Sequence, residues 1–163
     1  MGLFSFLCGK SKKITIYAPT DGKVIDLSEV PDEAFSKRMV GDGCAIDPSG
    51  TEICSPVDGK LENVFPTKHA ILLESKEGLE IIVHFGVDTV KLNGKGFTQL
   101  RDEGNVKVGD KMVAYNLSEI KDKVPSIKTP ILINNMEFVQ EIKVLNLGKN
   151  VKIGDPIMEV TIK

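Results

Sequence analysis

The two histidines of this 163-residue chain, His69 and His84, are the side chains best suited to chemistry at neutral pH. Each borders an apolar run typical of a strand, residues 70–73 after His69 and residues 81–83 before His84. A neutral imidazole, with an unperturbed pKa of about 6.5, attacks an electrophile without a separate base. Two adjacent imidazoles could share a group transfer, one carrying the group on nitrogen while the other donates a hydrogen bond to it.

A hairpin decides whether the two rings meet. Residues 75–78, Ser-Lys-Glu-Gly, read as the turn between the two runs. A turn centred between Lys76 and Glu77 would place His69 directly opposite His84, and a two-residue loop one position later would make them diagonal neighbours on one face. A three-residue loop would put the rings on opposite faces, because side chains alternate with period two. We adopt a two-residue loop, and hence a ring contact, as a hypothesis.

Polar neighbours extend the pair. Thr67 lies on the same face as His69 by alternation, so its hydroxyl could select the tautomer of that ring. Asp88 would share a face with His84 only if the strand continues past Gly86. Two histidines and a carboxylate are also a familiar zinc set, although no HxH or HExxH motif is present. Ordinary half-buried strand histidines are the third alternative.

Six apolar residues of the chain have two interpretations. They belong to the core, or they surround the reactive pair as a docking surface that excludes water from the transfer. The residues concerned are Phe35, Met39, Val40, Phe65, Ile82 and Val87.

Composition narrows the function classes. The net charge is -2, from 21 basic and 23 acidic residues mixed along the chain, which argues against a nucleic-acid partner. The cysteines Cys8, Cys44 and Cys54 form no CxxC pair, which favours a reducing, cytoplasmic setting over a disulfide framework. No apolar run reaches the roughly 20 residues of a spanning helix.

Two pairs of repeated phrases indicate an internal duplication. Residues 18–25 resemble residues 55–62, and residues 105–113 resemble residues 150–158, each placing a glycine and an aspartate between apolar steps. We predict an all-β fold, an antiparallel β-sandwich or barrel with strands of about five residues. One or two short helices are expected, within residues 31–38 and, capped by Ser118, across residues 119–123.

The N-terminal segment, residues 1–13, is set apart from a single domain of residues 14–163. It combines Leu3, Phe4, Phe6 and Leu7 with following lysines. It is interpreted either as a flexible tail or as a peripheral contact with anionic lipid.

Residues 83–97 carry a family resemblance: Val-His-Phe-Gly-Val-Asp-Thr-Val-Lys-Leu-Asn-Gly-Lys-Gly-Phe. This run resembles the active-site signature of the glucose-family enzyme IIA proteins of the bacterial phosphoenolpyruvate:sugar phosphotransferase system. Further landmarks follow in family order over roughly residues 14–163, among them Ala18-Pro19, Val30-Pro31-Asp32, Val40-Gly41-Asp42-Gly43, Pro56-Val57-Asp58-Gly59, Thr67-Lys68-His69-Ala70 and Gly154-Asp155.

The resemblance implies a β-sandwich with a duplicated hybrid motif and a phosphocarrier function. His84 would take a phosphoryl group on Nε2 from the histidine phosphocarrier protein and pass it to a cysteine of a permease IIB domain. His69 would hold the phosphate and Thr67 would bond to His69, with Asp32 and Asp88 flanking the site.

The resemblance also bears on the docking surface and on metal binding. Phe35, Met39, Val40 and Phe65 would dock the partners. Ile82 stands where relatives carry phenylalanine, and Met39 where they carry a branched aliphatic, so partner choice stays open. No cofactor is required, although some relatives bind zinc through the two histidines and a partner's carboxylate.

Rival functions remain beside the phosphocarrier. The unphosphorylated face could regulate other transporters or enzymes, and a zinc-dependent hydrolase shares a related fold. A lipoyl-type carrier needs a modifiable lysine, which residues 134–137 lack. We expect a monomer, either free-standing or part of a longer permease, and the sugar stays undefined because this component does not bind it.

Overall fold

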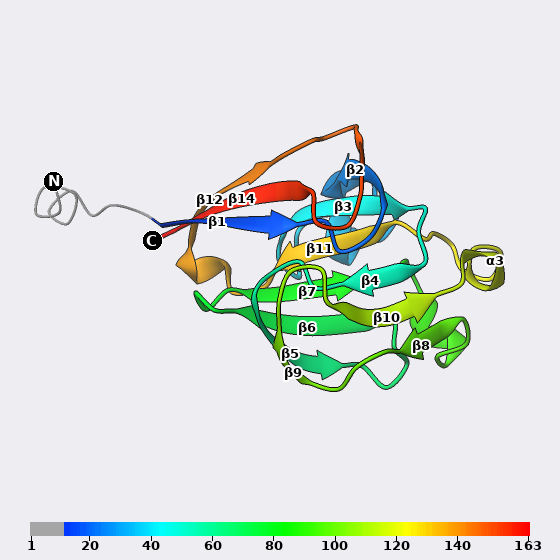
Figure 1. Ribbon diagram of the computed structural model, residues 1–163. Coiled ribbons are helices and arrows are strands. Elements are labelled where there is room, and N and C mark those ends of the chain that lie inside the picture. Colours follow the sequence, from blue (N-terminus) through cyan, green and yellow to red (C-terminus); the bar gives the residue numbers. More distant parts are fainter. Residues whose placement is uncertain (1–11) are drawn as a thin grey trace, which may run out of the picture.

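The computed structural model describes residues 12–163 and contains three antiparallel sheets (Figure 1). The first has the order β1 (Lys12–Tyr17), β14 (Pro156–Ile162) and β12 (Val139–Val144). The second has the order β4 (Glu52–Cys54), β10 (Lys111–Tyr115) and β8 (Phe97–Gln99). The third has eight strands, in the order β13 (Asn150–Val151), β2 (Gly22–Asp26), β3 (Asp42–Pro48), β11 (Thr129–Ile133), β7 (Glu80–His84), β6 (Ala70–Ser75), β5 (Gly59–Val64) and β9 (Gly104–Val106).

One hydrophobic cluster joins the three sheets. It includes Ile16 of β1, Met112 of β10 and Ile71 of β6, all fully buried. Strands β12 and β14 also contact β3 of the large sheet. Side chains from facing sheets that interdigitate in this way form the core of a sandwich, and the predicted antiparallel β-sandwich is confirmed.

Two related sets of strands, β4 to β10 on one side and β1 to β3 with β11 to β14 on the other, make matching hydrogen bonds. The strand order β1-β14-β12 of the first sheet corresponds to the order β4-β10-β8 of the second. In the eight-stranded sheet, the order β13-β2-β3-β11 from one edge corresponds to the order β9-β5-β6-β7 from the other. The matching donors and acceptors are Tyr17 N to Pro56 O and Cys54 N to Pro19 O (3.0 and 2.7 Å), Ala18 N to Asp155 O and Ser55 N to Asp110 O (2.7 and 2.8 Å), and Ile153 N to Asp21 Oδ1 and Val108 N to Asp58 Oδ1 (2.8 and 2.9 Å). The predicted duplication is therefore present in three dimensions, with the repeated aspartates accepting from the repeated turns.

Helices are few and short among the described residues. They are η1 (Leu27–Glu29), α2 (Glu33–Ser36), η2 (Thr89–Leu92), α3 (Leu117–Ile120) and η3 (Met136–Phe138). Helix α2 lies within the predicted residues 31–38, and Asp32 caps it by accepting from Ala34 N at 2.9 Å.

The second helix was expected across residues 119–123 with Ser118 as its cap, and both were wrong, because α3 spans Leu117–Ile120. Asn116, not Ser118, caps α3, because its side-chain oxygen accepts from the amides of both Ser118 and Glu119.

A second, smaller hydrophobic cluster lies around α2. Its members are Ile25, Leu27, Val30, Phe35, Ala45, Val87 and Leu132. It anchors the connection between β2 and β3, which matters for the site described below.

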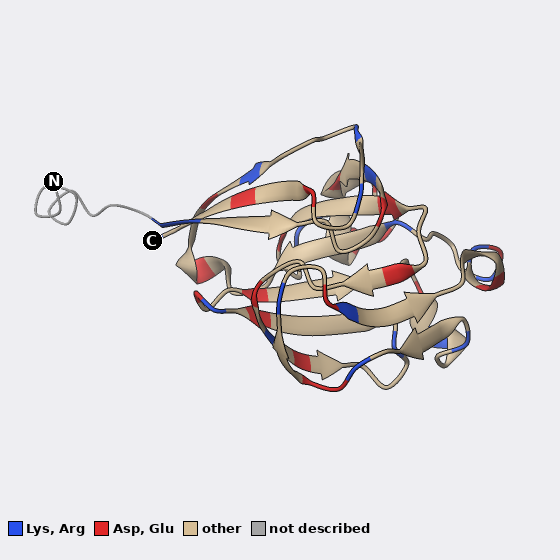
Figure 2. Ribbon diagram, in the orientation of Figure 1, with Lys and Arg blue, Asp and Glu red and all other residues tan. Residues whose placement is uncertain are grey.

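The described chain begins in β1, where Lys12 pairs with Ile162 and Lys13 with Thr161. Lys12 and Lys13, which the sequence analysis assigned to the N-terminal segment, thus lie in β1. The suggested lipid-contacting residues Leu3, Phe4, Phe6 and Leu7 lie outside the described residues. Within residues 12–163 no helix is long and apolar enough to cross a membrane. Figure 2 shows acidic and basic residues interspersed over the ribbon.

Candidate functional site

The β6–β7 hairpin has a three-residue loop, so the expected two-residue loop was wrong. Ala70 pairs with His84 and Glu74 pairs with Glu80. The turn closes through Gly78 N donating to Ser75 O at 2.8 Å, with Gly78 in the left-handed region at φ 99°. Glycine adopts that conformation without a steric penalty, which lets the loop take one residue more than the expected turns.

The two imidazole rings nevertheless contact each other. Their centroids are 4.8 Å apart and their planes lie at 83°, an edge-to-face arrangement. His69 precedes β6 in a turn where Lys68 has φ 61° and its amide donates to Phe65 O at 2.7 Å. Side chains do not alternate with period two through such a turn. The ring of His69 therefore lies on the same side as the ring of His84, although the strand register alone would place it on the opposite face.

A hydrogen bond determines the tautomer of His84, the last residue of β7. Its Nδ1 lies 2.8 Å from the carbonyl oxygen of Gly86. A carbonyl oxygen only accepts hydrogen bonds, so Nδ1 carries the proton and the lone pair of the neutral ring is on Nε2. His84 is half-buried, so part of the residue is exposed to solvent.

His69 is held by Thr67. The hydroxyl of Thr67 lies 2.6 Å from Nδ1 of His69, and the His69 side chain is buried, with 4% of its surface exposed. When the hydroxyl donates to Nδ1, the proton of the ring is on Nε2 and His69 is a donor. His69 is thus the less accessible ring and is suited to assist its neighbour.

Both rings are uncharged at neutral pH. Burial lowers the pKa of His69 to about 4, with a further contribution from the repulsion that a protonated His69 would feel from a protonated His84. Burial also lowers the pKa of His84, against the opposing effects of the Gly86 carbonyl and of the Asp32 carboxylate. A neutral pair suits nucleophilic attack.

The apolar residues predicted around the site divide into two groups. Phe35 is 8% exposed and Val87 is buried, and both belong to the smaller cluster behind the site. The ring of Phe35 lies 4.9 Å from that of His84. The others, Met39 (73% exposed), Val40, Phe65 and Ile82, reach the surface at least in part, and the ring of Phe65 lies 6.1 Å from that of His69.

The two aspartates differ in their relation to His84. Asp32 caps α2 and acts on His84 through its charge. Asp88 has φ 60° and pairs with Lys91 at 3.6 Å. Strand β7 ends at His84, so the continuation past Gly86 that would have placed Asp88 on the same strand face does not occur.

The histidine pair offers a metal two nitrogen ligands. Among residues 12–163, no three or more histidine, cysteine or acidic side chains gather as metal ligands. A tetrahedral zinc ion needs four ligands, and a hydrolytic zinc site usually takes three from the protein. The pair therefore fits zinc only when further ligands come from a partner or from water.

Two structural contributions were not predicted from sequence. The backbone carbonyl of Gly86 accepts from His84, for which the only sequence signal is a glycine two residues after the histidine. Arg38 binds acidic residues on both sides of the α2 segment, and no sequence pattern pointed to it.

Gly86 is a position where alanine should be strongly destabilising. Its φ is 69°, and a Cβ there would lie 2.7 Å from Ser126 O and 2.9 Å from Cγ2 of Thr89. We expect Gly86→Ala to lower the free energy of unfolding by about 3 kcal/mol, since left-handed strain and overpacking add. In Gly109→Ala, with φ 89° and nothing within 4 Å, only the strain of about 1 kcal/mol applies. Urea unfolding of both variants tests this, and equal losses would contradict it.

The low pKa of His69 predicts an acid-dependent loss of stability. In the folded protein His69 stays neutral down to a pKa of about 4, whereas in the unfolded chain it takes up a proton near pH 6.5. Stability therefore falls as pH drops from about 6.5 to about 4, by at most about 1.4 kcal/mol per pH unit from this residue. His69→Gln lacks this term, so the stability of the wild type relative to the variant should decrease between pH 7 and pH 4.5. Denaturant titrations that show a constant difference would refute it.

Comparison with known proteins places this geometry in a family. The family model for the phosphoenolpyruvate-dependent sugar phosphotransferase system, EIIA 1, matches residues 14–139. The PTS system glucose-specific EIIA component of Haemophilus influenzae is 46% identical over 144 residues, which are 85% of this chain and 87% of the relative. That of Oceanobacillus iheyensis is 42% identical over 159 residues, 97% of this chain and 96% of the relative.

A solved structure agrees with the sequence matches. The glucose permease IIA from Mycoplasma capricolum matches with a TM-score of 0.81 at 42% identity, covering 91% of this chain and 96% of that chain. The resemblance noted in residues 83–97 is thereby confirmed at the level of the whole fold. The chain belongs to the EIIA 1 family of the phosphoenolpyruvate-dependent sugar phosphotransferase system, whose glucose-specific members are phosphotransferase components of sugar transport.

Proposed function

We propose that Nε2 of His84 accepts a phosphoryl group from the histidine phosphocarrier protein and passes it to a cysteine of a permease IIB domain, in the cytoplasm. The observation that carries the proposal is the hydrogen bond from Nδ1 of His84 to Gly86 O. It leaves the lone pair on Nε2, the atom that has to attack phosphorus.

The transfer consists of two displacements at phosphorus. In the first, Nε2 of His84 forms a bond to phosphorus as the nitrogen–phosphorus bond of the donor's phosphohistidine breaks. In the second, the cysteine thiolate of the IIB domain attacks the same phosphorus, and the bond to His84 breaks as the sulfur–phosphorus bond forms. His84 leaves as the neutral ring that began the cycle. Phosphoryl transfer passes through a loose transition state, and its catalysis depends mainly on positioning and on hydrogen-bond donors aimed at the phosphoryl oxygens.

His69 supplies a donor of this kind in our proposal. Its ring is edge-on to that of His84 at 4.8 Å, and Thr67 holds its Nδ1. A donor already in place costs no reorganisation when negative charge develops on the phosphoryl oxygens.

The exposed apolar side chains provide the docking surface of this proposal. Met39, Val40, Phe65 and Ile82 reach solvent at least in part, and the ring of Phe35 packs against that of His84 at 4.9 Å. Apolar side chains around a reactive group exclude water when a partner binds, which protects the phosphoryl group from hydrolysis. Zinc binding through His69, His84 and a partner's carboxylate would use the same two rings and so would compete with phosphorylation.

Reconstituted phosphorylation tests the proposal. The full chain is incubated with phosphoenolpyruvate, enzyme I and the histidine phosphocarrier protein, and its intact mass is measured. We expect the gain of one phosphoryl group that is lost in acid and kept in base, and no gain when the phosphocarrier protein is omitted. Peptide mapping that assigned the group to His69 or to a serine would overturn the assignment.

A further inference from the structure

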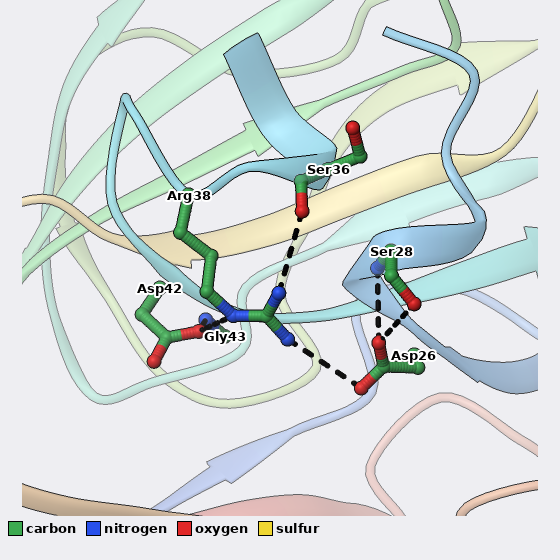
Figure 3. Close-up of polar contacts among 6 residues, drawn as sticks. All are labelled: Asp26, Ser28, Ser36, Arg38, Asp42 and Gly43. Atoms are coloured by element: carbon green, nitrogen blue, oxygen red, sulfur yellow. Dashed lines mark hydrogen bonds and ion pairs between the residues drawn. The ribbon is translucent and has the colours of Figure 1, made fainter. Parts of the chain in front are cut away.

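Arg38 bridges the carboxylates of Asp26 and Asp42 (Figure 3). Its Nε donates to Oδ1 of Asp42 at 2.8 Å, one terminal nitrogen lies 3.5 Å from Oδ1 of Asp26, and the other donates to Ser36 O at 3.4 Å. Its backbone has φ 59°, in the left-handed region, which is uncommon for a residue other than glycine. The guanidinium therefore meets its partners from a strained turn just after α2.

The two carboxylates mark the ends of neighbouring strands. Asp26 ends β2 and Asp42 begins β3, and these strands pair directly in the large sheet. Asp26 accepts from both the amide and the hydroxyl of Ser28, and these bonds, followed by the charge of Arg38, lower its pKa. Asp42 accepts from Gly43 N at 2.8 Å. Both partners of Arg38 are thus held by their own hydrogen bonds.

The chain between the carboxylates, residues 27–41, carries several parts of the site. Asp32 acts on His84 through its charge, and the ring of Phe35 lies 4.9 Å from that of His84. Met39 and Val40 reach the surface one and two residues after Arg38. Arg38 closes this segment, because it joins the end of α2 to the strands on either side.

The bridge contributes little to the stability of the whole fold. The side chains of Arg38, Asp26 and Asp42 are each more than a third exposed, at 39%, 42% and 36%. Exposed ion pairs usually contribute little to the stability of a fold. Strands β2 and β3 already pair over five residues of each strand without it, so the effect of the bridge falls on the segment that it closes.

We infer that Arg38 is a positioning residue for phosphoryl acceptance, which holds the 27–41 segment so that Phe35 supports His84 and Met39 and Val40 present a preformed surface to the donor protein. This inference rests on the proposed function. A preformed surface saves the free energy of ordering at the moment of binding. Loss of the bridge should therefore weaken donor binding more than it slows the chemical step at His84.

The test compares three variants of the full chain. Arg38→Gln removes the guanidinium. Arg38→Asn also removes it, but asparagine tolerates the left-handed backbone, so the turn itself is retained. The matched control is Lys37→Gln, which makes the same charge change at the adjacent residue and breaks only the exposed pair with Glu33 at 3.3 Å.

Two readouts separate positioning from a general loss of structure. Initial rates with the phosphorylated phosphocarrier protein as donor should show KM raised about tenfold in both Arg38 variants, with kcat within about twofold of wild type, a tenfold change corresponding to 1.4 kcal/mol. The ring proton resonances of His84 should also move, because Phe35 no longer stays 4.9 Å away. Lys37→Gln should match the wild type in both.

The outcomes separate the inference from the proposed function. A wild-type protein that accepts no phosphoryl group refutes the proposed function itself. Wild-type acceptance with unchanged KM and unmoved His84 resonances in Arg38→Gln overturns the inference alone. Wild-type behaviour of Arg38→Asn would do the same, since it would show that only the turn is needed. So would a tenfold rise of KM in Lys37→Gln, since it would show a general charge effect.

Discussion

His84→Gln should accept no phosphoryl group. The amide nitrogen of glutamine offers no nucleophilic lone pair in place of that of Nε2. Glutamine also lacks the ring that Gly86 O orients at 2.8 Å. Loss of a covalent nucleophile removes the reaction path itself, so the rate should fall below detection. Intact-mass measurement after reconstituted phosphorylation is the readout, on protein shown to be folded by circular dichroism.

His69→Gln is the matched control for this result, since it makes the same substitution at the neighbouring ring. The mass of this control should still rise by one phosphoryl group. If His84→Gln gained the group as well, the acceptor would be another residue, although the family assignment would stand.

His69→Gln should retain acceptance but slow the onward transfer roughly 10- to 1000-fold, the scale for losing one transition-state donor. Glutamine keeps an N–H donor of similar reach. It lacks the rigid ring that Thr67 holds at 2.6 Å and that lies edge-on to His84 at 4.8 Å. Single-turnover transfer from the phosphorylated variant to an isolated IIB domain measures the effect.

Thr67→Val tests the same role without touching either ring. It keeps the shape of threonine and removes the hydroxyl at Nδ1 of His69, so the tautomer is no longer selected. We expect onward transfer to slow by less than in His69→Gln, and acceptance to stay unchanged.

Onward transfer by His69→Gln at the wild-type rate would remove His69 from the mechanism.

Turn chemistry and local alternation were enough to predict the architecture. The repeated glycine-aspartate turns and short β-branched runs predicted an antiparallel β-sandwich or barrel with an internal duplication. The sheets form a sandwich, and the paired hydrogen bonds of residues 17–22 and 54–59 show the duplication. Helix caps were harder, because Asn116 and Ser118 are both good caps and only the folded backbone selects one.

The histidine contact was predicted from an incorrect register. A two-residue loop was expected to bring the rings together. The loop instead has a third residue, the left-handed Gly78, and the resulting register places Ala70 opposite His84. The rings meet because the turn through Lys68 rotates His69 out of strand alternation. A left-handed lysine is uncommon, so residue types alone did not signal it.

The sequence by itself indicated the family, through the resemblance carried by residues 83–97, and it indicated the fold class and the two candidate histidines, through residue types and periodicity along the chain. Only the tertiary structure decided which nitrogen of His84 is free, which apolar residues lie behind the site, and how Arg38 closes the 27–41 segment. Each of these depends on groups that face one another only after strands pair and turns close: Gly86 O with His84, Phe35 with His84, and Arg38 with Asp26 and Asp42.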